Sequence, residues 1–178
     1  MTYKKERGMG MELKIPENFF VGAAMSGPQT EGAYKTGGRL ESIWDTWSDL
    51  SISDFYNKVG SYVGNNFYEK YEDDIKLLKS LHMDSFRTSM QWSRLLTKDG
   101  KLNQEGAQFY HKVCKCAKEN QIELFMNLYH FDMPTYLFER GGWESRDVVE
   151  AYAAYARAAF REFGSEIRYW FTFNEPIV

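Results

Sequence analysis

Four short apolar segments, separated by longer amphipathic stretches, constrain the fold of this 178-residue chain more than any other feature. The segments at 19–25, 84–90, 122–129 and 167–173 are rich in Phe, Val, Ile, Tyr or Trp and have the length of buried strands. Between them, apolar residues recur at three- and four-residue steps, which predicts three helices. The helical residues are Phe67, Tyr71, Ile75, Leu78 and Leu81, then Tyr110, Val113, Cys114 and Ala117, then Val148, Tyr152, Tyr155, Ala159 and Phe163. Asn103, just before the second helix, is predicted to cap it.

This alternation of strand and helix favours parallel strands joined by right-handed crossovers. A doubly wound nucleotide-binding sheet is disfavoured, because the segment 22–27 lacks the glycine-rich turn G-x-G-x-x-G and the loop from 25 to about 61 is too long. Polar and aromatic residues instead gather after the carboxyl end of each strand, as in a barrel. We therefore predict an α/β fold, the N-terminal half of a (β/α)8 TIM barrel, with about four parallel strands and three crossover helices.

Charge and composition exclude several classes of partner. The net charge of −3 provides no basic surface for nucleic acid, and no apolar run approaches the roughly 20 residues that cross a bilayer. Cys114 and Cys116 stand two apart on a predicted helix and face different directions, so we expect neither a disulfide nor a metal site. A reducing, cytoplasmic location fits this cysteine usage. Residues 1–15 are predicted to be a leader or extension, and residues 16–178 the barrel half.

Glu175 is the residue best placed for catalysis. It directly follows the apolar strand 169–173 and lies between Asn174 and Pro176, whose ring restricts the backbone. A carboxyl group at the mouth of an apolar pocket keeps its proton more readily, as an acid catalyst requires near neutral pH. The alternative interpretation of Glu175 is a solvated carboxylate without a function.

Four further candidate residues lie within or after the predicted strands, and three of them have a structural alternative. The amides of Gln29 and Asn174 suit sugar hydroxyls, although such residues are common in loops and turns. His130 follows the third strand, where a histidine is more often structural than functional. Arg87 lies within the second strand, and a permanent charge there requires a buried carboxylate partner. In a barrel, all these strand ends meet at one rim.

The motifs together resemble glycoside hydrolase family 1, the β-glucosidase and 6-phospho-β-glucosidase family, from about Pro16 to the last residue. The motifs that carry the resemblance, in chain order, are Phe20-Val21-Gly22-Ala23-Ala24, Gln29-Thr30-Glu31-Gly32, Ser42-Ile43-Trp44-Asp45, Tyr71-Glu72-Asp73-Asp74-Ile75, Phe86-Arg87-Thr88-Ser89, Trp92-Ser93-Arg94, Leu128-Tyr129-His130-Phe131-Asp132-Met133-Pro134, Gly141-Gly142-Trp143 and Thr172-Phe173-Asn174-Glu175-Pro176. Their order and spacing make a coincidental match unlikely.

The resemblance implies a cofactor-free glycosidase that retains anomeric configuration. It implies that Glu175 is the catalytic acid/base, and that Gln29, His130 and Asn174 bind the sugar. It also implies that Arg87 supports the nucleophilic carboxylate. That chemistry needs two carboxyl groups about 5–5.5 Å apart.

Two details resemble the 6-phospho-glycosidase branch of the family. Phe131 follows His130 where many plain β-glucosidases have Trp, and Ile177 follows Pro176 where many members also have Trp. The expected partner is a small-molecule β-glycoside, phosphorylated in this interpretation. A plain β-glucosidase or β-galactosidase, and a non-catalytic sugar-binding pseudo-enzyme, remain the alternatives.

The sequence stops after the fourth strand, whereas a full barrel takes roughly 250 residues. The missing half of the barrel is expected to hold the nucleophile and the phosphate-binding cluster. We therefore expect negligible hydrolysis by residues 1–178 alone, and self-association through the open edges of the half barrel.

Overall fold

The computed structural model describes residues 14–49 and 56–177. The predicted leader therefore lies mostly outside the described residues. In the described part of the chain, no helix combines the length and the apolar character needed to cross a membrane.

One parallel sheet organises the molecule. Its strands are β1 (Gly22–Ala24), β2 (Ser85–Ser89), β3 (Glu123–Tyr129) and β4 (Tyr169–Phe173), and they pair in chain order β1-β2-β3-β4. All three pairings are parallel. The four predicted strands are thus confirmed, although the first is shorter than its apolar segment: Phe19 is 58% exposed and precedes β1.

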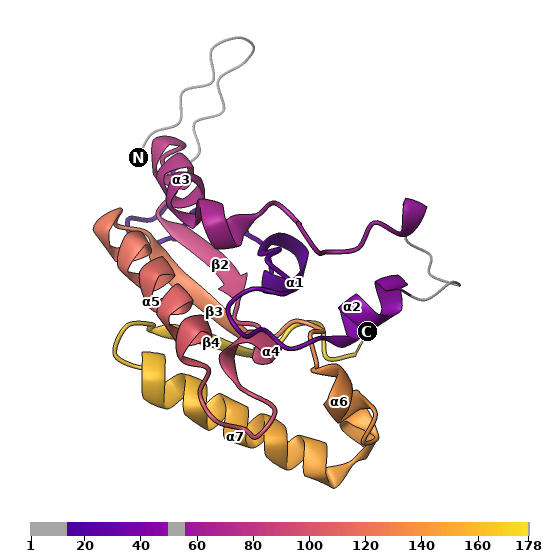
Figure 1. Ribbon diagram of the computed structural model, residues 1–178. Helices are drawn as coiled ribbons and strands as arrows, with labels where there is room; N and C mark the ends of the chain where they lie inside the picture. The colour runs from indigo at the N-terminus through magenta and orange to yellow at the C-terminus, as the bar shows by residue number, and fades with distance from the viewer. Residues whose placement is uncertain (1–13, 50–55, 178) are drawn as a thin grey trace.

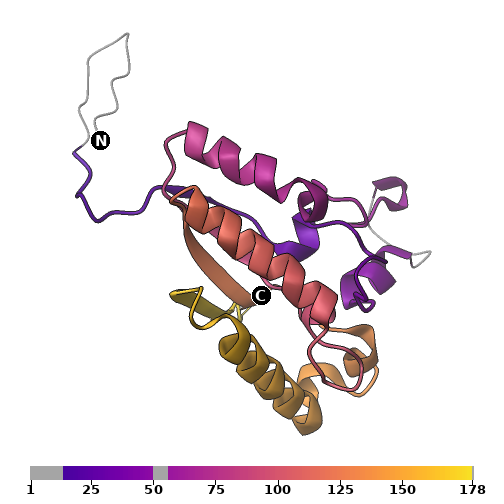
Figure 2. The ribbon, with the colours of Figure 1, turned by 60° about the vertical axis from the view of Figure 1, so that its left-hand side comes forward.

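Three long helices cover one side of this sheet and lie beside one another (Figures 1 and 2). They are α3 (Phe67–Ser80), α5 (Gln104–Glu119) and α7 (Arg146–Phe163), and each connects two neighbouring strands as predicted. Shorter helices occupy the connecting loops, namely α1 (Gly27–Thr30), α2 (Ile43–Asp49), η1 (Tyr56–Lys58), α4 (Trp92–Leu95), α6 (Thr135–Phe138) and η2 (Gly142–Glu144). Three helices and four strands in this order form the expected half of a barrel.

The prediction that Asn103 caps α5 is confirmed for its position but not for a side-chain hydrogen bond. Asn103 is the N-cap residue, but its side chain makes no capping hydrogen bond. Its Nδ2 atom instead donates to the carbonyl oxygens of Gly37 and Arg94, at 2.6 and 2.9 Å. The amide therefore ties the loop after β1 to α4 rather than serving the helix.

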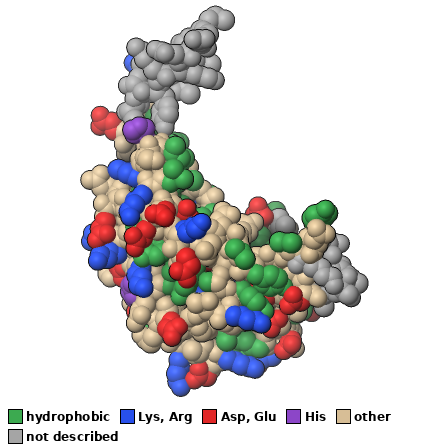
Figure 3. Space-filling model, turned by 45° about the horizontal axis from the view of Figure 1, so that its top comes forward, with side chains coloured by type: hydrophobic (Ala, Val, Ile, Leu, Met, Phe, Trp, Pro, Cys, Tyr) green, Lys and Arg blue, Asp and Glu red, His purple; other side chains and the backbone are tan. Residues whose placement is uncertain are grey.

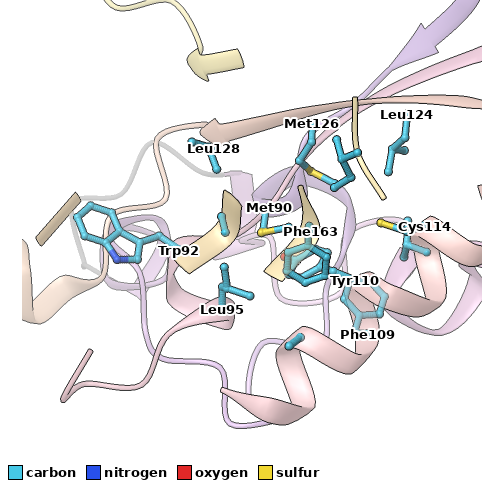
Figure 4. Close-up of a cluster of buried hydrophobic side chains, with 14 of the residues drawn as sticks. Met90, Trp92, Leu95, Phe109, Tyr110, Cys114, Leu124, Met126, Leu128 and Phe163 are labelled. Atoms are coloured by element: carbon cyan, nitrogen blue, oxygen red, sulfur yellow. The ribbon is translucent and has the colours of Figure 1, made fainter. Parts of the chain in front are cut away.

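The hydrophobic core lies between the sheet and the helices (Figure 4). Alternate residues of β3, Leu124, Met126 and Leu128, are buried among side chains from α5 and α7. Each such side chain contributes about 1.5–3 kcal/mol by leaving water. Tyr155 of α7 is fully buried, and its hydroxyl lies 2.8 Å from the carbonyl oxygen of Met90 and 2.9 Å from that of Leu128. This hydroxyl fixes α7 at the carboxyl ends of β2 and β3.

The opposite face of the sheet carries aromatic side chains that are only partly covered. Phe125 of β3 stacks on Tyr169 of β4, with ring centroids 4.6 Å apart, and Phe20 packs edge-on against both rings. Phe171 and Phe173 of β4 are 43% and 36% exposed. Elsewhere, the face visible in Figure 3 mixes acidic and basic side chains without a large region of one sign. The inner face of the half barrel therefore carries accessible aromatic rings, with the charged Arg87 of β2 among them.

Candidate active site

The carboxyl ends of the strands bring the predicted site residues together. Arg87, half-buried on β2, donates from Nη2 to Oδ1 of Asn174, at 2.8 Å. Asn174 directly follows β4, and its backbone N–H donates to the carbonyl oxygen of Tyr129, at 2.9 Å. The guanidinium of Arg87 also lies over the ring of Phe171, 5.5 Å from its centroid. These contacts join the ends of β2, β3 and β4.

Arg87 does not meet the carboxylate partner that its place in a strand predicts. Within the described residues it forms no ion pair, and its hydrogen-bond acceptor is the amide of Asn174. A half-buried guanidinium keeps part of its hydration, which reduces the cost of leaving the charge unpaired. Arg87 therefore retains donor capacity toward the inner face of the sheet.

Gln29 lies in α1, the short helix that follows β1. The backbone N–H of Gly27 donates to the hydroxyl oxygen of Ser89 at the end of β2, which holds α1 against the sheet. The hydroxyl of Ser26 donates to Oε1 of Gln29, at 2.6 Å. Gln29 is exposed and, together with His130, lines a cavity of about 410 Å³. The predicted pair of sugar-binding residues thus shares one hollow.

His130 follows β3 and is held in its neutral form. Burial, together with the smaller effect of the nearby positive charge of Arg87, lowers the pKa of its imidazole to about 4. A neutral imidazole has one N–H donor and one acceptor nitrogen. Near neutral pH, His130 therefore suits hydrogen bonding to a ligand better than ion pairing.

The turn after His130 depends on Asp132, to which sequence reasoning assigned no role. Asp132 is fully buried, and its carboxylate accepts hydrogen bonds from the backbone N–H groups of His130 and Trp92, at 3.2 and 2.8 Å. Burial raises the pKa of this carboxyl group to about 7, although both N–H groups favour the ionised form. Between His130 and Asp132, Phe131 has a left-handed backbone (φ 67°). Asp132 thus supports a strained turn at the rim.

Glu175 lies at the same rim but is more open than predicted. It is exposed, with a left-handed backbone (φ 45°), and lines a cavity of about 480 Å³ whose walls are largely aromatic. The aromatic lining residues are Tyr129, Phe131, Trp143 and Phe173. Glu175 supplies the only carboxylate among the described residues that line this cavity. The apolar pocket is therefore confirmed beside Glu175, but the described residues do not enclose its carboxyl group.

Phe131 connects three hollows of the rim. Besides the cavities of Gln29 and Glu175, it lines an apolar cavity of about 360 Å³ between α2 and α6. Trp44 is shared by that apolar cavity and the cavity of Gln29. Gln29, His130, Asn174 and Glu175 therefore line hollows that share Phe131, whereas Arg87 lines a separate hollow on the inner face of the sheet.

A buried ion-pair network supports this rim from below, and sequence reasoning missed its role. Arg94 donates from Nε to Oε2 of Glu31, at 2.7 Å, and both side chains are almost inaccessible. The same carboxylate accepts from Nε2 of Gln91 and from the hydroxyl of Tyr110, at 2.6 and 2.8 Å. Glu31 is two residues from Gln29, so the network fixes the start of the long loop that carries Gln29.

A second buried pair extends the network to α2. Arg39 donates from Nη1 to Oδ2 of Asp45, at 2.8 Å, and from Nε to Oε1 of Gln91, at 3.0 Å. Gln91 thus links both ion pairs through its two amide atoms. Polar residues inside otherwise apolar motifs were the available sequence signal, but sequence alone does not reveal which pairs meet.

Among the described residues, no three His, Cys, Asp or Glu side chains cluster as metal ligands.

Comparison with known proteins identifies the family. The family model for glycosyl hydrolase family 1 matches residues 11–178. The chain belongs to glycosyl hydrolase family 1. It is 43% identical over 168 residues to the 6-phospho-beta-glucosidase GmuD of Bacillus subtilis (94% of this chain, 36% of that protein). It is 40% identical over 166 residues to Beta-glucosidase 9 of Arabidopsis thaliana (92% of this chain, 32% of that protein).

Solved structures of the family give the same result for the fold. The GH1 beta-glucosidase from Exiguobacterium antarcticum B7 superposes with a TM-score of 0.88 at 37% identity, over 92% of this chain and 37% of that chain. The family 1 glucosidase from Thermotoga maritima gives 0.87 at 33% identity, over 92% and 37%. The present chain spans about a third of the length of these relatives. Its parallel sheet and helices correspond to part of their TIM barrel.

Proposed function

We propose that this chain carries the acid/base half of a retaining β-glycosidase. The observation behind the proposal is that Arg87, His130 and Asn174, from three different strands, lie together at the rim that Glu175 occupies. Glu175 donates its proton to the oxygen of the leaving group and later takes a proton from the attacking water. Gln29, His130 and Asn174 hold the hydroxyl groups of the sugar.

Residues 1–178 alone are proposed to be inactive. Retaining hydrolysis needs a second carboxyl group about 5–5.5 Å from the first, and Glu175 is the only carboxylate among the described residues that line its cavity. Arg87, whose described contacts include no carboxylate, would support that second group from another part of the barrel. Turnover of an aryl β-glycoside by the purified 178-residue chain would overturn this proposal.

We propose a 6-phospho-β-glycoside as the substrate and the cytoplasm as the location. The 43% identity to a 6-phospho-beta-glucosidase and the Phe131 residue support this preference. The alternative, a plain β-glucoside, is supported by relatives named beta-glucosidases at 37–42% identity. A cytoplasmic enzyme suits a substrate phosphorylated during uptake, and the two cysteines of the chain are free.

A chimera tests the catalytic proposal. The chain replaces the aligned segment of the B. subtilis relative, which amounts to 36% of that protein. Hydrolysis of aryl 6-phospho-β-glucoside is expected, and a folded but inactive chimera would contradict the proposal. Comparing phosphorylated and plain substrates before and after Phe131→Trp tests the contribution of this chain to specificity. We expect Phe131→Trp to lower the kcat/KM for the phosphorylated substrate relative to that for the plain substrate. If this ratio is unchanged, Phe131 no longer supports the choice of a phosphorylated substrate.

The open inner face leads us to propose self-association of the isolated chain. Strands β1 and β4 each have one unpaired edge within the described sheet, and the side chains of Phe171 and Phe173 in β4 are partly exposed. Unpaired edges and contiguous apolar surface favour association. Light scattering is expected to detect species larger than a monomer, and a monodisperse monomer would contradict this expectation.

A non-catalytic sugar-binding role is the second candidate, favoured by the cavity that Gln29 and His130 share. In that case the isolated chain would show sugar-dependent quenching of tryptophan fluorescence. The quenching would be lost in Gln29→Ala and His130→Ala. Absence of quenching in the parent chain would exclude this role.

A further inference from the structure

Asn127 of β3 is linked through hydrogen bonds to two of the predicted site residues, His130 and Asn174. Its side chain is fully buried, and its Nδ2 atom donates to the carbonyl oxygen of Tyr129, at 3.0 Å. The same nitrogen lies 3.4 Å from Nδ1 of His130. The carbonyl of Tyr129 also accepts the backbone N–H of Asn174. A single buried amide therefore contacts His130 directly and shares an acceptor with Asn174.

The orientation of this amide follows from its neighbours. Rotating the group by 180° would place Oδ1 of Asn127 against the carbonyl oxygen of Tyr129, so that two acceptors would face each other. With Nδ2 toward Tyr129, the Oδ1 atom is buried without a hydrogen-bond partner among the described residues. Buried amide oxygens are rarely left unsatisfied. An apolar side chain would avoid this penalty, so packing alone does not account for an amide here.

The two hydrogens of the Asn127 amide have two acceptors. One hydrogen points to the Tyr129 carbonyl, and the other is available for Nδ1 of His130, which must then carry a lone pair. The imidazole is neutral near pH 7, so its single proton resides on Nε2. The backbone of His130 is fixed independently by Asp132. The contact with Asn127 therefore acts on the protonation pattern of the ring.

We propose that Asn127 is a positioning residue that holds His130 in the Nε2–H tautomer. His130 then presents an N–H donor to the ligand, and a hydroxyl oxygen of the sugar accepts it. The opposite tautomer would present a lone pair at Nε2 and reverse the direction of the hydrogen bond. The identity of the ligand rests on the proposed function, whereas the tautomer is a property of the chain itself.

Nitrogen NMR of the ¹⁵N-labelled chain at pH 7 tests this proposal, with His130→Gln to assign the ring. We expect a protonated Nε2 and an unprotonated Nδ1, without averaging between tautomers. Asn127→Asp places an acceptor beside Nδ1, so the ring proton is expected to move to Nδ1 and the pKa of His130 to rise by at least one unit. Asn127→Ala removes the contact and is expected to give signals averaged between the two tautomers.

The matched control is Asn120→Ala, which removes an amide that bonds the carbonyl oxygen of Cys116 at the end of α5. It is expected to leave the His130 signals unchanged. If the alanine variant unfolds, Asn127→Ser provides a replacement that is polar and smaller than asparagine. Circular dichroism checks the fold of each variant. A parent chain with Nδ1 protonated, or variants at Asn127 that leave the His130 tautomer unchanged, would overturn the proposal. Neither readout requires activity, so loss of the proposed function would leave the test intact.

Discussion

Replacing Glu31 by glutamine is expected to destabilise the chain more than any surface change. The carboxylate of Glu31 accepts from Arg94 and Gln91 through Oε2 and from Tyr110 through Oε1. Glutamine would leave Arg94 buried without a counter-charge, and its amide NH₂ would face at least one of these donors. Removing one partner of a buried ion pair costs about 3–5 kcal/mol. We expect Glu31→Gln to lower the free energy of unfolding by about that amount.

Urea denaturation followed by tryptophan fluorescence measures this loss, since the chain contains five tryptophans. Glu150→Gln is the matched control, because Glu150 also pairs with an arginine, Arg146, at 2.7 Å but on the surface. The side chains of Arg146 and Glu150 are 81% and 59% exposed, and such i,i+4 pairs contribute about 0.3–0.5 kcal/mol. If the two glutamine variants lose similar stability, the reasoning about the buried network is wrong.

Two further predictions concern titration and reactivity. His111 bonds Glu166 through Nδ1 and Glu162 through Nε2, at 2.6 and 2.9 Å; burial alone would lower its pKa, but these carboxylates outweigh burial and raise it. The stabilising contribution of His111 is thus fully present below the unfolded pKa of about 6.5 and is lost as pH rises through the folded pKa. His111→Gln should therefore lower the free energy of unfolding more at pH 6 than at pH 9. An equal loss at both pH values would contradict this reasoning. Burial raises the pKa of Cys114 to about 12 and raises that of Cys116, so iodoacetamide should alkylate both thiols only after unfolding; rapid alkylation of the native chain would refute their burial.

The sequence predicted the parts of the fold that depend on periodicity. The short apolar run of β3 and the repeating apolar face of α7 depend only on local sequence, so both elements were found where they were expected. The start of β1 was misjudged, because Phe19 is apolar but lies outside the sheet. Hydrophobicity indicates that a residue favours burial, but it does not reveal which neighbours are present to bury it.

The site was predictable as a set of residues and less so as a geometry. Parallel strands place their carboxyl ends at one edge, which brings Arg87 and Asn174 into contact. The acceptor for Arg87 proved to be an amide, because partners far apart in sequence depend on side-chain directions that spacing does not encode. The same limit hid the contacts of Asp132 and Asn127, whose acceptors and donors are largely backbone groups. Nearly all residue types carry the same backbone N–H and C=O groups, so the sequence does not indicate which backbone group a side chain will bond.

The catalytic role of Glu175 is the central claim, and rescue kinetics test it most directly. In the chimera with the B. subtilis relative, Glu175→Gln is expected to lower turnover of an aryl 6-phospho-β-glucoside by about 10²–10⁴-fold. Azide should restore turnover and yield a β-glycosyl azide, because this anion attacks the glycosyl-enzyme without a general base. The control Glu139→Gln, at an exposed position, should behave as the parent. A Glu175→Gln chimera with parental turnover, or one that azide does not rescue, would contradict the assignment of Glu175 as the acid/base.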